Sequence, residues 1–135
     1  MKIRTSLYRV LTVALFALAA PLYAHHGTAD YDYNKTLTEK VTITDFKWTN
    51  PHCQIEFDVK DDKGSVQHWT VETLNPSSLR RDGWILGRES LKAGDTVTIT
   101  FHSAKNGAKM GFLEKAVLAD GTVLRGSRTA PDGEQ

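Results

Sequence analysis

The sequence contains a single cysteine, Cys53, so no internal disulfide can form and the fold must be stabilised by packing. It also lacks an excess of charge, because 17 Lys and Arg residues stand against 16 Asp and Glu residues. Without a basic surface that displaces counterions from a polyanion, nucleic acid is not an expected partner. Free cysteines are most often buried as small apolar residues, and we predict that role for Cys53 over that of a thiolate ligand.

The motifs of common enzyme classes are missing as well. The sequence has no His-x-x-x-His spacing, no paired-cysteine motif and no His-Glu-x-x-His helix, and no Gly-rich turn carries the Lys-Ser or Lys-Thr of a phosphate loop. Ser77-Ser78 lies at an expected helix start, where hydroxyls cap backbone amides, and has no assignable His and acid partner. A hydrolase or NTPase is therefore not expected, and a non-enzymatic role is favoured.

Long apolar runs are absent except near the start of the chain. Three basic residues precede an apolar stretch of 11 residues, Val10–Ala20, and Pro21-Leu22-Tyr23-Ala24 resembles a processing region. Because a helix that spans a bilayer needs about 20 residues, we predict a cleaved signal peptide over residues 1–24 and no transmembrane anchor after cleavage. The mature protein would then begin at His25 in the periplasm of a Gram-negative-type envelope.

The rest of the chain is dominated by a period of two, in which β-branched and aromatic residues alternate with polar ones, as is typical of half-buried strands. Between the third and fourth expected strands, an Asn cap, a Pro in the first turn and a following Gly predict one short helix within Asn75–Gly83. The expected strands are Thr38–Phe46, His52–Lys60, Val66–Leu74, Thr96–Ser103, Leu113–Ala119 and Thr122–Arg125.

Three strands, a short helix and then further strands is the order of the OB barrel, whose helix closes one end. We therefore predict an all-β domain with one short helix, an OB-like antiparallel barrel of five to six strands. A small β-sandwich is the alternative, because it also uses short strands with one buried face. The domain would span residues 37–125, between an N-terminal segment (residues 25–36) and a loose tail (residues 126–135).

Processing after Ala24 would create the chemically richest point of the chain, the start His25-His26-Gly27. The free amine and the imidazole Nδ1 of a terminal His can close a six-membered chelate ring on a metal ion. Such a ring suits Cu(II), Ni(II) or Zn(II), which accept nitrogen donors. We predict that the amino-terminal His25 is a metal ligand and that His26 is a further candidate.

The strand pattern provides a second candidate ligand, His52. Cys53 and Ile55 fall on the inward face of their strand, so His52 points outward at the start of the same strand. The same alternation around Trp69 predicts that Glu72 points outward and reaches solvent. It makes the same prediction for His68 and His102.

These residues support functions of different classes. The first is a metal-binding protein, with copper as the most plausible ion, held by His25 and His52 and by His26 or Glu72. The second is a non-catalytic interaction module, in which the surface around Trp48 binds an envelope protein or a small ligand. A metal-dependent oxidoreductase is a third, because a copper site with an open position can react with oxygen.

A set of short motifs is spread along the mature chain. They comprise His25-His26, Asp30-Tyr31, Lys35-Thr36-Leu37-Thr38, Trp48-x-Asn50-Pro51-His52, Trp69-x-Val71-Glu72, Leu79-Arg80-Arg81-x-Gly83-Trp84, Leu91-Lys92-Ala93-Gly94-Asp95-x-Val97 and Asp120-Gly121. In this combination the chain resembles a family of small exported bacterial proteins described only as a domain of unknown function. The resemblance implies export and a compact β-rich domain, and it names no ligand. Around His102 the sequence departs from the His-Pro pair of the family, so the resemblance assigns no role to His102.

Overall fold

The computed structural model describes residues 31–126. The predicted signal peptide, His25, His26 and nearly all of the predicted tail lie outside these residues. No helix in this part of the chain is long and apolar enough to cross a membrane. The elements run in the order β1 (Tyr31–Lys47), β2 (Gln54–Lys60), β3 (Val66–Glu72), α2 (Pro76–Arg81), the 3-10 helix η2 (Gly87–Ser90), β4 (Thr96–Ala104), β5 (Met110–Val117) and β6 (Val123–Arg125).

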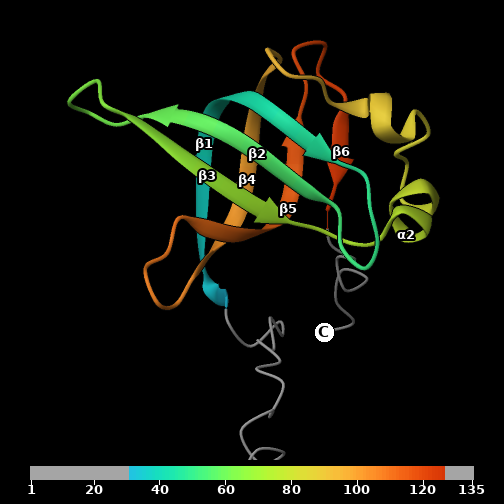
Figure 1. Cartoon of the computed structure of the whole chain (residues 1–135), viewed down its shortest axis with the longest axis horizontal. Coiled ribbons are helices and arrows are strands. Elements are labelled where there is room, and N and C mark those ends of the chain that lie inside the picture. Colours follow the sequence, from blue (N-terminus) through green and yellow to red (C-terminus); the bar gives the residue numbers. More distant parts are fainter. Residues whose placement is uncertain (1–30, 127–135) are drawn as a thin grey trace, which may run out of the picture.

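Five of the strands close into a barrel (Figure 1). Their order is β3-β2-β1-β4-β5, with β6 added beside β5, and β3 pairs with β5 to complete the closure. The predicted OB-like barrel with one short helix is therefore confirmed. The barrel is mixed rather than fully antiparallel, because the closing β3–β5 pair is parallel. The two strands can run in the same direction because a long crossover through α2, η2 and β4 connects them.

The predicted strand boundaries agree with the structure to within about three residues, except at the start of β1. This strand begins at Tyr31, well before the predicted Thr38. Its first residues pair with β4 across an irregularity between Tyr31 and Thr36, and a second irregularity lies between Ile43 and Asp45 in the β1–β2 pair. Such irregularities bend a strand, which allows β1 to pair with both β2 and β4 around the barrel.

The inner face of the barrel follows the alternation of the sequence. In β2 and the residue before it, Cys53, Ile55 and Phe57 are fully buried, as predicted. The rings of Phe57 and Phe101 meet edge to face at 5.9 Å across the barrel. The core continues through Val41, Ile43, Val71, Val97, Ile99, Leu113, Ala116 and Leu124.

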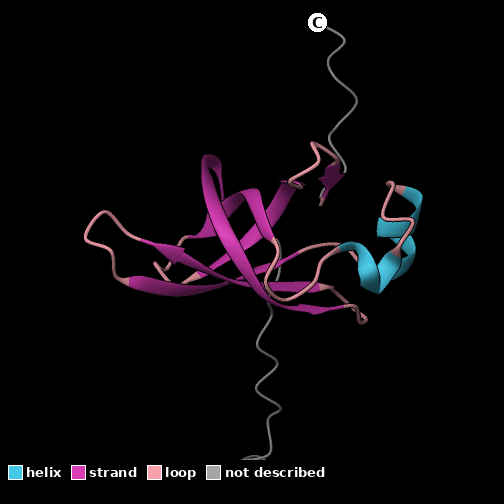
Figure 2. Cartoon of the chain, turned by 90° about the horizontal axis from the view of Figure 1, so that it is seen from above, coloured by secondary structure: helices cyan, strands magenta, loops and turns pink. Residues whose placement is uncertain are grey.

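The helices lie at one end of the barrel, and the β2–β3 hairpin projects from the opposite end (Figure 2). The predicted helix forms as α2: Asn75 caps it by accepting a hydrogen bond from the backbone N–H of Ser78 at 2.9 Å, and Pro76 occupies its first turn. Leu79 of α2 and Trp84 beyond it are fully buried. Together these two side chains close this end of the core.

We expect Asn75→Ala to lower the free energy of unfolding by about 1 kcal/mol, because a backbone N–H of the first turn loses its acceptor. Chemical denaturation measures the change. Ser77→Ala is the matched control, since Ser77 is an exposed hydroxyl in the same turn. An equal decrease in the free energy of unfolding of both variants would show that the Asn75 cap does not stabilise α2.

Candidate functional site

The structure brings two of the predicted ligands, His52 and Glu72, next to each other. His52 lies in the loop between β1 and β2, which contains the cis peptide Asn50–Pro51, and Glu72 is the last residue of β3. Two backbone hydrogen bonds hold this loop beside the end of β3. The N–H of Cys53 donates to the carbonyl oxygen of Leu74, and the N–H of Thr73 donates to the carbonyl oxygen of Cys53. As a result, His52 Nδ1 lies 3.8 Å from Glu72 Oε2.

The prediction that Glu72 reaches solvent is wrong, because this residue is only 7% exposed. Glu72 does lie on the outer face of β3, in register with Phe112 of β5. The first residue of β1 covers this face: the Tyr31 ring lies 5.9 Å from Phe112, and the Tyr31 hydroxyl donates a 2.9 Å hydrogen bond to Glu72 Oε2. The early start of β1, which the alternation did not reveal, therefore buries the carboxylate.

A buried carboxylate is costly unless a cation or several hydrogen bonds compensate it. Within residues 31–126, no lysine or arginine forms an ion pair with Glu72, and the His52 ring is the group of possible positive charge beside it. The side chain of His52 is 40% exposed. The pair thus combines an inner oxygen donor with an outer nitrogen donor, both of which metal ions accept.

The described residues do not complete a metal site on their own. No group of three His, Cys, Asp or Glu residues within 31–126 is arranged to hold a metal ion. Further ligands would have to come from outside this range, where His25 and His26 lie. The sequence enters the described structure at Tyr31, whose side chain bonds directly to Glu72.

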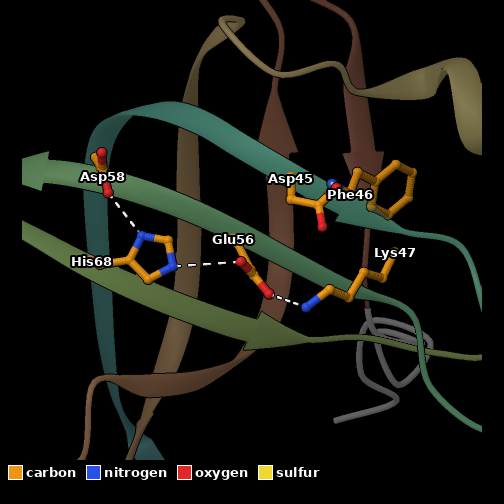
Figure 3. Close-up of polar contacts among 6 residues, drawn as sticks. All are labelled: Asp45, Phe46, Lys47, Glu56, Asp58 and His68. Atoms are coloured by element: carbon orange, nitrogen blue, oxygen red, sulfur yellow. Dashed lines mark hydrogen bonds and ion pairs between the residues drawn. The ribbon is translucent and has the colours of Figure 1, made fainter.

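His68 belongs to a separate network on the outer face of β2 and β3 (Figure 3). Its Nδ1 lies 2.8 Å from Asp58 Oδ1, and its Nε2 lies 3.5 Å from Glu56 Oε2. Glu56 in turn forms an ion pair with Lys47 of β1. His68 therefore has carboxylate partners at both ring nitrogens.

The ion pair with Lys47 lowers the pKa of Glu56 from its ordinary value of 4.5, first through the side-chain hydrogen bond. A carboxylate with a lowered pKa stabilises the folded protein at pH values above the pKa that the same group has in the unfolded chain. This contribution is lost as the pH falls through the pKa that the group has in the folded protein. We expect Lys47→Met to raise the pKa of Glu56 and to reduce the loss of stability in acid. Carboxyl-carbon NMR titration measures the pKa, and Lys92→Met, at the exposed pair with Glu89, should leave it unchanged.

His102 takes part in an aromatic cluster that the sequence analysis missed. Tyr33 packs against the His102 ring at 5.0 Å and against Phe112 at 6.5 Å. His102 Nε2 lies 3.9 Å from Glu114 Oε2, and its side chain is largely covered. The spacing Tyr31-x-Tyr33 was the signal that could have revealed this cluster, because it places both rings on one face of an extended segment.

Two other candidates of the sequence analysis have structural roles. Cys53 is fully buried, and burial raises the pKa of its thiol, so it stays protonated and is a poor ligand. Trp48 is half-buried between Phe46, at 5.8 Å, and the guanidinium of Arg80, at 5.6 Å. The Trp48 ring therefore packs against neighbours of its own chain and keeps part of its surface exposed.

Comparison with known proteins identifies one family. Neither a curated protein nor a solved structure matches the chain significantly. A family of unknown function, DUF6152, matches residues 13–115, which include both His52 and Glu72. The resemblance noted from the short motifs is thereby confirmed, and the chain belongs to this family of unknown function.

Proposed function

We propose that the protein is an exported metal-binding protein of the periplasm, with copper as its preferred ion. The ligands are the amine and imidazole of the processed His25, the imidazole of His52 and the carboxylate of Glu72, with His26 as a further donor. Non-enzymatic binding is the role of this site. The observation that carries the proposal is the buried Glu72 carboxylate, which faces an imidazole and forms no ion pair with a lysine or arginine among the described residues.

The spacing of the pair fits a shared ion. Metal–nitrogen and metal–oxygen bonds are each about 2.0–2.2 Å long, so two donors on one ion are separated by at most about 4.2 Å. The 3.8 Å between His52 Nδ1 and Glu72 Oε2 is within this limit and is longer than a hydrogen bond. Both atoms can therefore approach the same ion with little rearrangement of the loop.

The processed amino terminus can reach this pair. His25 precedes Tyr31 by six residues, and an extended chain covers about 3.3–3.6 Å per residue, which gives about 20 Å of reach. Tyr31 itself is hydrogen-bonded to Glu72. A reach of this length is sufficient for His25 to meet His52 on the same ion.

Copper is favoured by the donor set. Nitrogen and oxygen donors without thiolate suit Cu(II), which heads the affinity series of divalent first-row metals for such ligands. The thiol of Cys53 is buried on the opposite face of its strand and is withheld from the site. Zn(II) and Ni(II) are expected to bind more weakly to the same ligands.

The experiment that tests the proposal is a copper titration of the processed protein with a matched pair of histidine variants. We expect one equivalent of Cu(II) to bind, and His52→Ala to weaken this binding by about tenfold or more, because a single lost ligand costs at least about 1.4 kcal/mol. His68→Ala removes another outward histidine of the barrel and should bind copper as the parent does. Equal affinities in the two variants would remove His52 from the site.

The alternative function, a non-catalytic interaction module for an envelope protein or small ligand, is supported by a different surface. Ile85 and Leu86, between α2 and η2, are 79% and 66% exposed. They line a cleft of about 270 Å³ together with Leu118 and Leu124. Exposed apolar patches of this kind often mark interaction sites. This function needs no metal ion, so the copper titration distinguishes it from the proposal.

A further inference from the structure

A second cleft is lined by residues of β1, β4 and the β2–β3 hairpin, the hairpin that projects from the end of the barrel opposite the helices. Its volume is about 230 Å³, whereas a cavity of about 150 Å³ is enough to hold benzene. Leu37, Trp69 and Phe101 form its apolar part, and Glu39 and Gln67 contribute polar groups. The mouths of β-barrels are preferred places for small-molecule sites, which combine apolar walls with a few convergent polar groups.

Glu39 breaks the inward pattern of β1. In the β1–β4 pair, Leu37, Glu39 and Val41 stand opposite Phe101, Ile99 and Val97, with no shift of register among them. All three partners in β4 are buried core residues. Glu39 therefore has the inward phase of β1, where the alternation alone calls for a hydrophobic residue, and its side chain is exposed and lines the cleft. Local violations of such a pattern are expected at functional sites.

The Glu39 carboxylate has no hydrogen-bond or ion-pair partner within residues 31–126. Gln67 is a second polar residue with an inward phase, in β3, because it has the same phase as Trp69 and stands opposite Val59. The side-chain nitrogen of Gln67 donates to Asp61 at 3.3 Å. The side-chain oxygen of Gln67 accepts no hydrogen bond within residues 31–126.

The charge of the lining is mostly negative. Glu39, Asp61 and Asp62 stand against Lys60 of the lining and Lys109, whose Nζ lies 4.9 Å from the centroid of the Trp69 ring. Negative charge and hydrogen-bond acceptors in the lining favour a cation that donates hydrogen bonds, and they disfavour an anion. The apolar side of the cleft requires that the same molecule also carry an apolar body.

We propose that this cleft binds a small organic cation, namely a primary ammonium group on a compact apolar body of about eight heavy atoms. The ammonium lies against the Glu39 carboxylate and donates to the Gln67 side chain. The apolar body packs on Trp69 and Leu37. This site is independent of the metal site, because it is built from the other end of the barrel and uses neither His52 nor Glu72.

The test is an NMR titration of the full chain with benzylammonium, which has eight heavy atoms. We expect the indole N–H of Trp69 and the side-chain amide of Gln67 to shift, with a Kd on the order of 1 mM for so small a ligand. Benzyl alcohol has the same shape without the charge, and it should bind about tenfold more weakly. Shifts absent up to about 20 mM benzylammonium would overturn the site, and equal binding of the alcohol would overturn the cationic class.

The matched protein variants are Glu39→Gln and Glu89→Gln. Glu39→Gln keeps the size of an exposed side chain and removes the charge, so the variant should fold, and we expect it to bind benzylammonium about fivefold or more weakly. Glu89 is an exposed carboxylate in η2, at the helical end of the barrel, and Glu89→Gln should bind as the parent does. Equal affinity in the two variants would overturn the role of Glu39 and with it the proposal.

Discussion

Acetylating the α-amine of the processed His25 is expected to lower the affinity of the protein for Cu(II) by about 100-fold or more. The acetylated nitrogen is an amide and is no longer a free amine donor, so the six-membered chelate ring with the imidazole of His25 cannot form. Copper is then bound only by imidazole and carboxylate groups that are not joined in a chelate ring, and such groups bind more weakly. Acetylation is preferred to an added residue, because an extra residue before His25 would place His26 third after a free amine, an arrangement that itself chelates Cu(II). Isothermal titration, or competition with a chelator of known affinity, measures the change.

The control is the protein amidated at the carboxyl group of Gln135, which leaves the amino terminus free and should not change copper binding. Intact mass must first establish that the exported protein begins at His25. If the acetylated protein binds copper as tightly as the parent, the amine is not a ligand. If the parent begins elsewhere or binds no copper, nickel or zinc, the metal proposal fails as a whole. Neither result would affect the cation cleft at Glu39.

The candidate metal site depends on three segments that are distant in the sequence. The β1–β2 loop supplies His52, the end of β3 supplies Glu72, and Tyr31 at the start of β1 holds the carboxylate from the other side. Because Tyr31 connects directly to the segment that contains His25, metal binding would tie that segment to the barrel. Glu72→Gln should therefore weaken copper binding without removing it, since the amide keeps one neutral oxygen donor.

Much of the fold follows from local patterns in the sequence. Cys53, Ile55 and Phe57 are buried as the alternation in β2 predicts, and the Asn75 cap begins α2 where the helix signals place it. These features depend on neighbouring residues, whose positions are fixed by the backbone geometry of a strand or a helical turn. The same local alternation identified His52 as a residue outside the core.

The burial of Glu72 could not be predicted because it depends on pairing across the barrel. Glu72 points away from the core, as its phase requires, and becomes buried only because Tyr31 and Phe112 cover the outer face there. The segment that begins with Tyr31 alternates aromatic with polar residues too briefly to indicate a strand. Likewise, the parallel contact between β3 and β5 joins segments about 40 residues apart, and no local pattern specifies it.

Trp84→Ala is expected to lower the free energy of unfolding by about 3–5 kcal/mol, because it leaves a large cavity in the core. Trp84 is fully buried and packs 5.5 Å from the Phe46 ring. Its indole N–H also donates a 2.8 Å hydrogen bond to the carbonyl oxygen of Arg125, which anchors β6. For a domain of this size the midpoint of thermal unfolding should fall by on the order of 15 °C or more.

Two further variants separate the contributions of Trp84. Trp84→Phe retains most of the apolar volume and removes the donor to Arg125. Its free energy of unfolding should therefore fall by less than that of Trp84→Ala, because only the hydrogen bond and part of the packing are lost. Trp48→Ala removes a half-buried ring of the same type, which packs against Phe46 and Arg80. This variant should lower the free energy of unfolding by less than Trp84→Ala does. If the two alanine variants unfold at the same denaturant concentration, Trp84 does not close the barrel. Because Trp84 forms no hydrogen bond or ring contact with His52 or Glu72, the folded fraction of Trp84→Phe should bind copper like the parent.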